Sequence, residues 1–322
     1  MQSKLSFRTM VAGLLAAGLF AHAPAWAQSV SVVSIVEHPA LDAVRDGVKQ
    51  GLADSGYTEE KGLKWQYQTA QGNNAIAAQI ARKFIGDRPD VIVAIATPAA
   101  QAVVAATKDV PVVYSAVTDP VAAQLVPTLE ANETNVTGVS DRLSLERQLE
   151  LIKQVVPDAK RVGMVYNPGE ANSVVVVKAM RELLAAQDMT LVEATAPRTV
   201  DVGAAARSLV GKVDVIYTNT DNNVVSAYEA LVKVGTDAKV PLIASDTDSV
   251  VRGAIAAVGI NYYDLGVQTG EMVARILKGE KPGSIPSESS EKLELFVNPG
   301  AAQKQGVKLD EAFIKSATKV VE

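Results

Sequence analysis

The chain has 322 residues, 48% of them hydrophobic, which is enough apolar material for two domains with their own cores. Its formal charge of −5 at pH 7 argues against nucleic acid or an anionic membrane surface as a partner. The sequence contains no cysteine, which excludes disulfides, cysteine nucleophiles, thiolate metal sites and a lipid anchor carried on cysteine.

The first 27 residues have the pattern of a secretory signal peptide. Lys4 and Arg8 precede an apolar stretch over 11–20, and Ala25-Trp26-Ala27 is an A-x-A cleavage signal. We therefore expect cleavage after Ala27, a formal charge of −7 for the mature chain, and export to a bacterial periplasm without a membrane anchor. His22 leaves with the leader, so His38 is the one remaining histidine and neither a metal site nor a cofactor is expected.

The first half of the mature chain alternates short apolar runs with amphipathic runs. The expected strands cover 31–36, 63–69, 91–96 and 110–117, and the expected helices cover 40–55, 73–85, 99–108 and a short stretch from 121. This β-α alternation predicts a parallel sheet with helices on both faces.

The stretch 91–101 is the centre of that first unit. Six apolar residues form a buried strand that ends at Thr97-Pro98. Thr97 suits the N-cap of the following helix and Pro98 its first position. A helix N-terminus at the end of a strand can bind a carboxylate or a phosphate, although the same residues also suit an ordinary strand–helix turn.

After a polar segment over 132–141, interpreted as a crossing between domains, the pattern begins again. Expected helices cover 144–156, 172–187, 202–210 and 224–234, and expected strands cover 161–166, 191–194, 213–217 and 241–244. The tail adds a strand over 254–259, a helix over 264–277 and a strand over 293–297. We predict an α/β protein with two Rossmann-like lobes and three hinge crossings: 28–140 plus about 252–290 form one lobe, and 141–251 plus about 291–322 form the other.

Catalytic motifs are missing from this sequence. It has no G-x-S-x-G elbow, no P-loop, and no G-x-G-x-x-G after the first strand. Without cysteine no Cys–His pair can form, and His38 is the one mature histidine that could act as a base for a serine. We therefore expect a protein that is not an enzyme, with an exported hydrolase as a minor alternative.

Polar residues gather where the expected strands end, at the edge where open α/β sheets bind ligands. Each of them also suits a helix cap or a turn for purely local reasons. The candidate ligand-binding residues are Glu37, His38, Thr97, Pro98, Ala99, Thr118, Asp119, Asn167, Asn172, Thr218, Asp221, Asn222, Ser245 and Asp246. Tyr114, Tyr166, Tyr217, Tyr262 and Tyr263 lie near the same ends and are candidates for stacking on a ring.

Several segments resemble the type I periplasmic substrate-binding proteins of ABC transporters, in the subfamily that binds tryptophan, tyrosine or related small molecules. They are Ile35-Val36-Glu37-His38-Pro39-Ala40-Leu41-Asp42, Ala96-Thr97-Pro98-Ala99-Ala100-Gln101, Val117-Thr118-Asp119-Pro120-Val121, Asn135-Val136-Thr137-Gly138-Val139-Ser140, Val165-Tyr166-Asn167-Pro168 and Asp264-Leu265-Gly266. They span the mature chain in the family's order.

The resemblance implies a monomeric receptor that closes on a small solute and delivers it to an inner-membrane ABC permease with its ATPase. A solute carboxylate would meet the residues from Thr97 to Ala99, together with Thr118. Its ammonium would meet Asp246 or Asp221, with Asp119 and Glu37 as further choices, and Asn167, Asn172 and Thr218 would close from the second lobe. A periplasmic sensor that signals to a membrane receptor is the main alternative.

Overall fold

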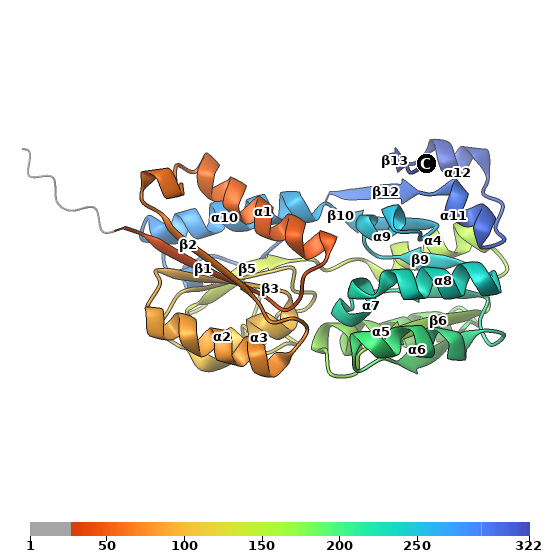
Figure 1. Cartoon of the computed structure of the whole chain (residues 1–322), viewed down its shortest axis with the longest axis horizontal. Coiled ribbons are helices and arrows are strands. Elements are labelled where there is room, and N and C mark those ends of the chain that lie inside the picture. Colours follow the sequence, from red (N-terminus) through yellow and green to blue (C-terminus); the bar gives the residue numbers. More distant parts are fainter. Residues whose placement is uncertain (1–26, 291) are drawn as a thin grey trace, which may run out of the picture.

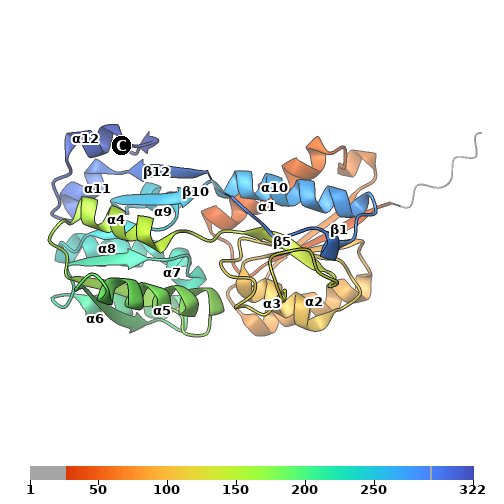
Figure 2. The ribbon, with the colours of Figure 1, turned by 180° about the vertical axis from the view of Figure 1, so that it is seen from behind.

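The computed structural model describes residues 27–290 and 292–322. The predicted signal peptide therefore lies outside the described residues, except for Ala27. Two lobes lie side by side, and each consists of a mostly parallel sheet with helices on both faces (Figures 1 and 2). This architecture confirms the predicted fold class.

The first lobe contains a six-stranded sheet in the order β11-β5-β4-β3-β1-β2. Its helices α1 and α10 cover one face, and α2 and α3 cover the other (Figure 1). All five residues of β3 are consequently buried, as its unbroken run of apolar side chains predicts. The bounds of the strands are Ser29–Ser34 for β1, Lys64–Thr69 for β2, Val91–Ile95 for β3, Val112–Ser115 for β4, Val136–Ser140 for β5 and Glu288–Ser289 for β11; those of the helices are Pro39–Asp54 for α1, Asn74–Asp87 for α2, Thr97–Ala106 for α3 and Tyr262–Leu277 for α10.

The second lobe contains a seven-stranded sheet in the order β13-β12-β10-β9-β8-β6-β7, with a hydrophobic core on each face. All its described pairings are parallel except that of β10 with β12. Its strands are β6 (Arg161–Tyr166), β7 (Thr190–Thr195), β8 (Val215–Thr218), β9 (Leu242–Ala244), β10 (Ala256–Ile260), β12 (Leu293–Val297) and β13 (Lys319–Val320); its helices are α4 (Leu145–Val155), α5 (Ala171–Ala185), α6 (Val202–Leu209), α7 (Asn222–Ser226), α8 (Tyr228–Ala238), α9 (Thr247–Val251), α11 (Pro299–Lys304) and α12 (Glu311–Lys315).

The chain passes between the lobes after β5, after β10 and after β11, because the neighbouring elements in sequence belong to different sheets. The passage expected near residue 252 therefore lies at about residue 261, since β10 pairs with β9 and β12 in the second sheet. The segment 132–141 is not only a crossing, because β5 pairs with β4 inside the first sheet.

Two further expectations about helices were wrong. The short helix expected from residue 121 is a set of turns, and the expected helix over 224–234 is divided into α7 and α8. Asp119 accepts a hydrogen bond from the Ala122 backbone N–H at 2.8 Å, which satisfies the turn locally without a continuing helix.

Helices α1 and α10 pack with their backbones in close contact. Gly47 and Gly51 on α1 face Gly266 and Gly270 on α10, each pair being four residues apart and therefore on one face of its helix. A Cβ atom added at Gly51 would lie 2.2 Å from the Val267 carbonyl oxygen. This contact holds α10 against α1 in the first lobe, although α10 follows β10 of the second lobe in sequence.

Replacing Gly51 by alanine is expected to destabilise the protein by about 1–3 kcal/mol, because the two backbones must separate to make room. Gly86 in α2 provides a matched control, since a Cβ atom added there meets nothing within 4 Å. We expect Gly86→Ala to stabilise the chain slightly through helix propensity. Chemical denaturation of both variants tests this packing, and equal stability of the two would contradict it.

Candidate functional site

A cavity lies between the lobes, at the facing carboxyl ends of their strands. Its volume is about 20 Å³, the room of a single water molecule, so the side chains around it must move apart to admit a larger solute. The first lobe contributes His38, Ala40, Leu41, Ala96, Thr97, Ala116, Thr118 and Tyr262, the first crossing contributes Asp141, and the second lobe contributes Asn172, Thr220, Asn222, Val225 and Asp246. We call this space the interlobe cavity.

Two alanines with positive φ shape the first-lobe wall. Ala96, between β3 and α3, has φ 73° and ψ 153°, a region that alanine rarely adopts, and Ala116 at the end of β4 has φ 55°. Ala96 is the N-cap of α3, so Thr97 is the first residue of the helix and Pro98 the second. The expected capping role of Thr97 was therefore wrong.

The Thr97 hydroxyl is consequently free for another partner. Its side chain is buried, and Oγ1 has no hydrogen-bond partner among residues 27–290 and 292–322. A buried polar atom without a partner costs about 1–3 kcal/mol, which is characteristic of a position that a ligand or a water completes. The N-terminus of α3 lies at the same point and adds amides that have no partner within the helix.

Asp141 lines the interlobe cavity at the point where the chain first crosses between the lobes. Its carboxylate accepts hydrogen bonds from the Thr118 hydroxyl and the Tyr262 hydroxyl, both at 3.0 Å. Burial raises the pKa of Asp141, and those two hydrogen bonds oppose the shift. Sequence reasoning did not identify Asp141 as a site residue, because its partner Tyr262 lies 121 residues away.

Glu170 determines the direction of the Asn172 amide in the second lobe. Asn172 Nδ2 donates to Glu170 Oε2 at 3.1 Å and to the Thr220 carbonyl oxygen at 3.0 Å. Asn172 Oδ1 has no partner within the part of the chain that the structure describes. Asn222 Nδ2 also donates to Glu170, at 2.6 Å. Burial, with the nearby charge of Asp221, raises the pKa of Glu170 above its ordinary value.

Asp246 places a buried carboxylate in the same wall. It accepts from the backbone N–H and the hydroxyl of Ser249, at 2.8 and 2.7 Å, and thereby caps α9. Burial raises its pKa, and no described residue forms an ion pair with it. The guanidinium of Arg252, in the same region, is paired with Glu229 at 2.7 Å. Asp246 therefore lacks a cation at contact distance.

His38 faces Asp246 and Asn222 across the cavity. Its Nδ1 accepts the Leu41 backbone N–H at 3.4 Å, which caps α1. Burial, followed by the charge of Arg252, lowers the pKa of His38 to about 3, while a hydrogen bond with Asn222 partly opposes this shift. His38 is therefore neutral at pH 7, and because Nδ1 is an acceptor its proton is on Nε2.

Six of the candidate residues line the interlobe cavity: His38, Thr97, Thr118, Asn172, Asn222 and Asp246. The others do not. Glu37 is exposed, Pro98 and Ala99 are buried within α3, and Asn167, Thr218 and Asp221 form hydrogen bonds inside the second lobe. Asp119 and Ser245 line a neighbouring cavity.

The structure also shows which aromatic candidate lines the interlobe cavity and which residues around it were not predicted. Tyr262 is the one candidate tyrosine that lines the interlobe cavity. Asp141 and Thr220 were not predicted to be site residues, because a crossing segment and a loop carry no pattern that reveals which side chains turn inward.

Other kinds of site find no support in the described part of the chain. No group of three or more His, Asp or Glu side chains there could hold a metal ion. None of the helices over residues 27–290 and 292–322 combines the length and the apolar character needed to cross a bilayer.

The chain matches the family described as ABC transporter substrate binding protein over residues 29–321. It is an ABC transporter substrate-binding protein. This membership confirms the family that the sequence resembles, and the proteins of this family bind solutes outside the cytoplasm for import.

Relatives of this substrate-binding protein support the same assignment. It is 40% identical to the tyrosine-binding protein of Clostridioides difficile over 271 residues, which is 84% of this chain and 79% of that protein. A structure of an ABC domain from Streptococcus pneumoniae in complex with L-Trp is 34% identical, with a TM-score of 0.88 over 91% of this chain and 99% of that one.

A third comparison bears on the conformation of the substrate-binding protein. The ligand-free, open structure of a Clostridium difficile substrate-binding protein with adhesive properties is 39% identical, yet its TM-score is 0.69 over 92% of this chain and 99% of that one. The tryptophan complex gives the higher score at lower identity. The structure described here is thus more similar overall to the solute-bound relative than to the ligand-free, open one.

Proposed function

We propose that this protein is a periplasmic receptor for an aromatic amino acid, which it delivers to an inner-membrane ABC permease and its ATPase. One observation carries the proposal. The interlobe cavity places anion-binding groups on the first lobe opposite acceptor groups on the second, which complements an amino-acid zwitterion. The relatives that bind tyrosine or L-Trp support an aromatic side chain.

The first lobe provides the proposed carboxylate site. Thr97 Oγ1 can donate to a carboxylate oxygen, and the N-terminus of α3 adds free amides and a partial positive charge. Thr118 lies beside it on the same wall. A solute carboxylate there would satisfy the Thr97 hydroxyl, which has no partner in the described structure.

The second lobe provides the proposed ammonium site. Asp246 supplies a buried carboxyl group that no cation of the described residues contacts, and Asn172 Oδ1 supplies an acceptor without a partner among them. The amide of Asn172 cannot reverse without losing its two donated hydrogen bonds, to Glu170 and to Thr220. The closed form alone brings both lobes to one solute, so binding shifts the population toward closure.

The remaining assignments belong to the same proposal. We expect export with cleavage after Ala27, a mature chain that is not membrane-anchored, and a monomer. The two lobes are residues 28–140 with about 262–290, and 141–261 with about 291–322. The family supports a small solute and a permease as the partners.

Calorimetric titration and thermal denaturation of the mature chain test the proposal. L-Tyr, L-Trp and L-Phe are the solutes, and L-Glu and L-Lys are the controls. A solute at about 100 times its Kd stabilises the native state by ~2.7 kcal/mol, so we expect the melting temperature to rise by several degrees. Absence of heat and of a thermal shift with all three aromatic amino acids would remove this solute class.

A further inference from the structure

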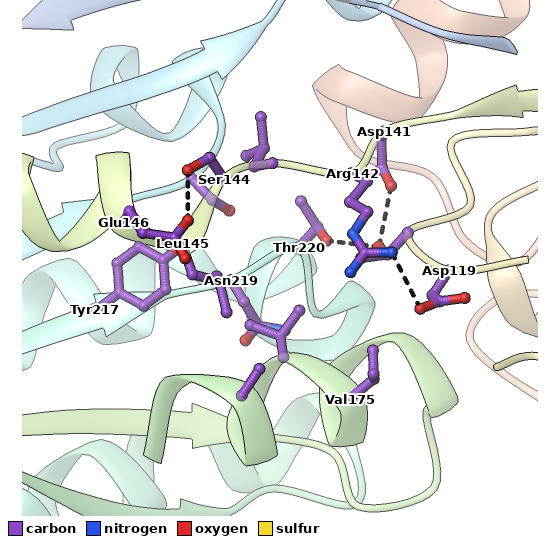
Figure 3. A pocket seen from close by; sticks show the side chains of 15 residues that line it. Asp119, Asp141, Arg142, Ser144, Leu145, Glu146, Val175, Tyr217, Asn219 and Thr220 are labelled. Carbon is purple, nitrogen blue, oxygen red and sulfur yellow. Dashed lines mark hydrogen bonds and ion pairs between the residues drawn. The ribbon is translucent and has the colours of Figure 1, made fainter. Parts of the chain in front are cut away.

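A second cavity adjoins the interlobe cavity, and we call it the side cavity (Figure 3). Its volume is about 250 Å³, and it is partly open to solvent. Thr118, Asp141 and Thr220 line both cavities. Thr118 and Thr220 come from opposite lobes, and their hydroxyl oxygens are 3.4 Å apart. Such a long hydrogen bond is weak, and the two side chains must separate for one solute to occupy both cavities.

The side cavity has an apolar wall, although ten of its fifteen lining residues are polar or aromatic with a polar group, as are nine of the fourteen around the interlobe cavity. Helix α5 and the segment after the first crossing face each other there, and Tyr217 of β8 lies between them (Figure 3). This wall consists of Leu143, Leu145, Val175, Val176, Ala179 and Tyr217.

Two polar atoms of residues that line the side cavity, Asn219 Oδ1 and Ser245 Oγ, have no hydrogen-bond partner among the described residues. Asn219 follows β8, is 2% exposed, and donates from Nδ2 to the Ser173 hydroxyl at 3.1 Å. Its Oδ1 accepts no hydrogen bond from any residue that the structure describes. Because the hydrogen bond to Ser173 fixes the amide, Asn219 Oδ1 can accept from an N–H or O–H group of a solute in the side cavity.

We propose that the solute occupies both cavities and that Asn219 selects its ring. The charged head lies in the interlobe cavity, the ring passes between Thr118 and Thr220, and the apolar wall of the side cavity covers it. Asn219 Oδ1 accepts from a ring that carries a donor, such as a phenol or an indole, and disfavours a plain phenyl ring. This inference rests on the proposed function and adds the position and specificity of the ring.

The specificity is tested with Asn219→Leu, which keeps the shape of the side chain and removes the acceptor. For the natural chain we expect the Kd of L-Phe to exceed that of L-Tyr by about tenfold or more. In Asn219→Leu we expect the two values to agree within about threefold. Equal affinity of the natural chain for both solutes, or an unchanged ratio in the variant, would overturn the role of Asn219.

The position of the ring is tested with Ala179→Phe. Ala179 is half-buried on α5, so a phenyl group there projects into the side cavity and not into the core. We expect at least tenfold weaker binding of L-Tyr and L-Trp and nearly unchanged melting of the ligand-free chain. Val174 is 45% exposed on the same helix and lines neither cavity, so Val174→Phe is the matched control and should bind normally.

The two proposals fail in different ways. If Ala179→Phe binds L-Tyr as tightly as Val174→Phe does, the ring lies elsewhere and only the two-cavity arrangement is overturned. If the natural chain binds none of the aromatic amino acids, the proposed function itself fails, and this inference fails with it.

Discussion

Asp246→Asn is expected to weaken binding of an aromatic amino acid by ~30-fold or more. Removing one partner of a buried, hydrogen-bonded charge pair costs about 2 kcal/mol or more, because the solute ammonium then lies buried without its counter-charge. Asparagine keeps the cap of α9, since it accepts from Ser249 as aspartate does. Titration calorimetry gives the affinity, and thermal denaturation without solute gives the stability.

The melting temperature without solute distinguishes a role of Asp246 in solute binding from a role in folding. Asp246 is a buried charge without an ion pair in the described structure, so neutralising it should leave the melting temperature unchanged or raise it. Asp248→Asn is the matched control, because burial also raises the pKa of Asp248, to about 6, while its side chain lies outside the interlobe cavity. Full affinity in Asp246→Asn together with a loss in Asp141→Asn would assign the ammonium to Asp141 instead.

Acid is expected to oppose closure through His38. The causes that shift its pKa to about 3 are burial between the lobes and the charge of Arg252, which belongs to the second lobe. When the lobes separate, the pKa of His38 returns toward its ordinary value of about 6.5. The closed form thus favours the neutral ring: its contribution is complete above pH 6.5 and is lost as the pH falls toward 3.

The pKa values of Glu170 and Asp246 are raised, so these two carboxyl groups change the affinity with pH in the direction opposite to His38. A variant of His38 separates the two contributions. His38→Asn keeps an N-cap acceptor for α1 and a donor toward Asn222, and it has no group that titrates. Between pH 7 and pH 5, the Kd of the natural chain divided by that of His38→Asn should rise by ~30-fold. A ratio that stays constant with pH would show that His38 does not sense closure.

The polar residues at the strand ends show how far local pattern reaches. Because parallel strands of one sheet end at one edge, the positions of Thr97, Thr118, Asn172 and Asp246 in the chain already indicate a common rim. The structure places all four around the interlobe cavity. Residues beside them, such as Asn167 and Thr218, carry the same pattern but serve local hydrogen bonds. Local pattern alone does not distinguish the two groups.

The sequence by itself determined the β-α repeat, the two lobes and the edge at which a solute would bind, because strand and helix periodicity and strand-end chemistry are local properties. Only the tertiary structure decided which atoms face that solute. The Thr97 hydroxyl lacks a partner in the described structure because Ala96 occupies the N-cap position, and the Asn172 oxygen lacks one because the Thr220 carbonyl, 48 residues away, fixes the amide nitrogen. Such directions depend on contacts between residues distant in the chain, and no local spacing encodes them.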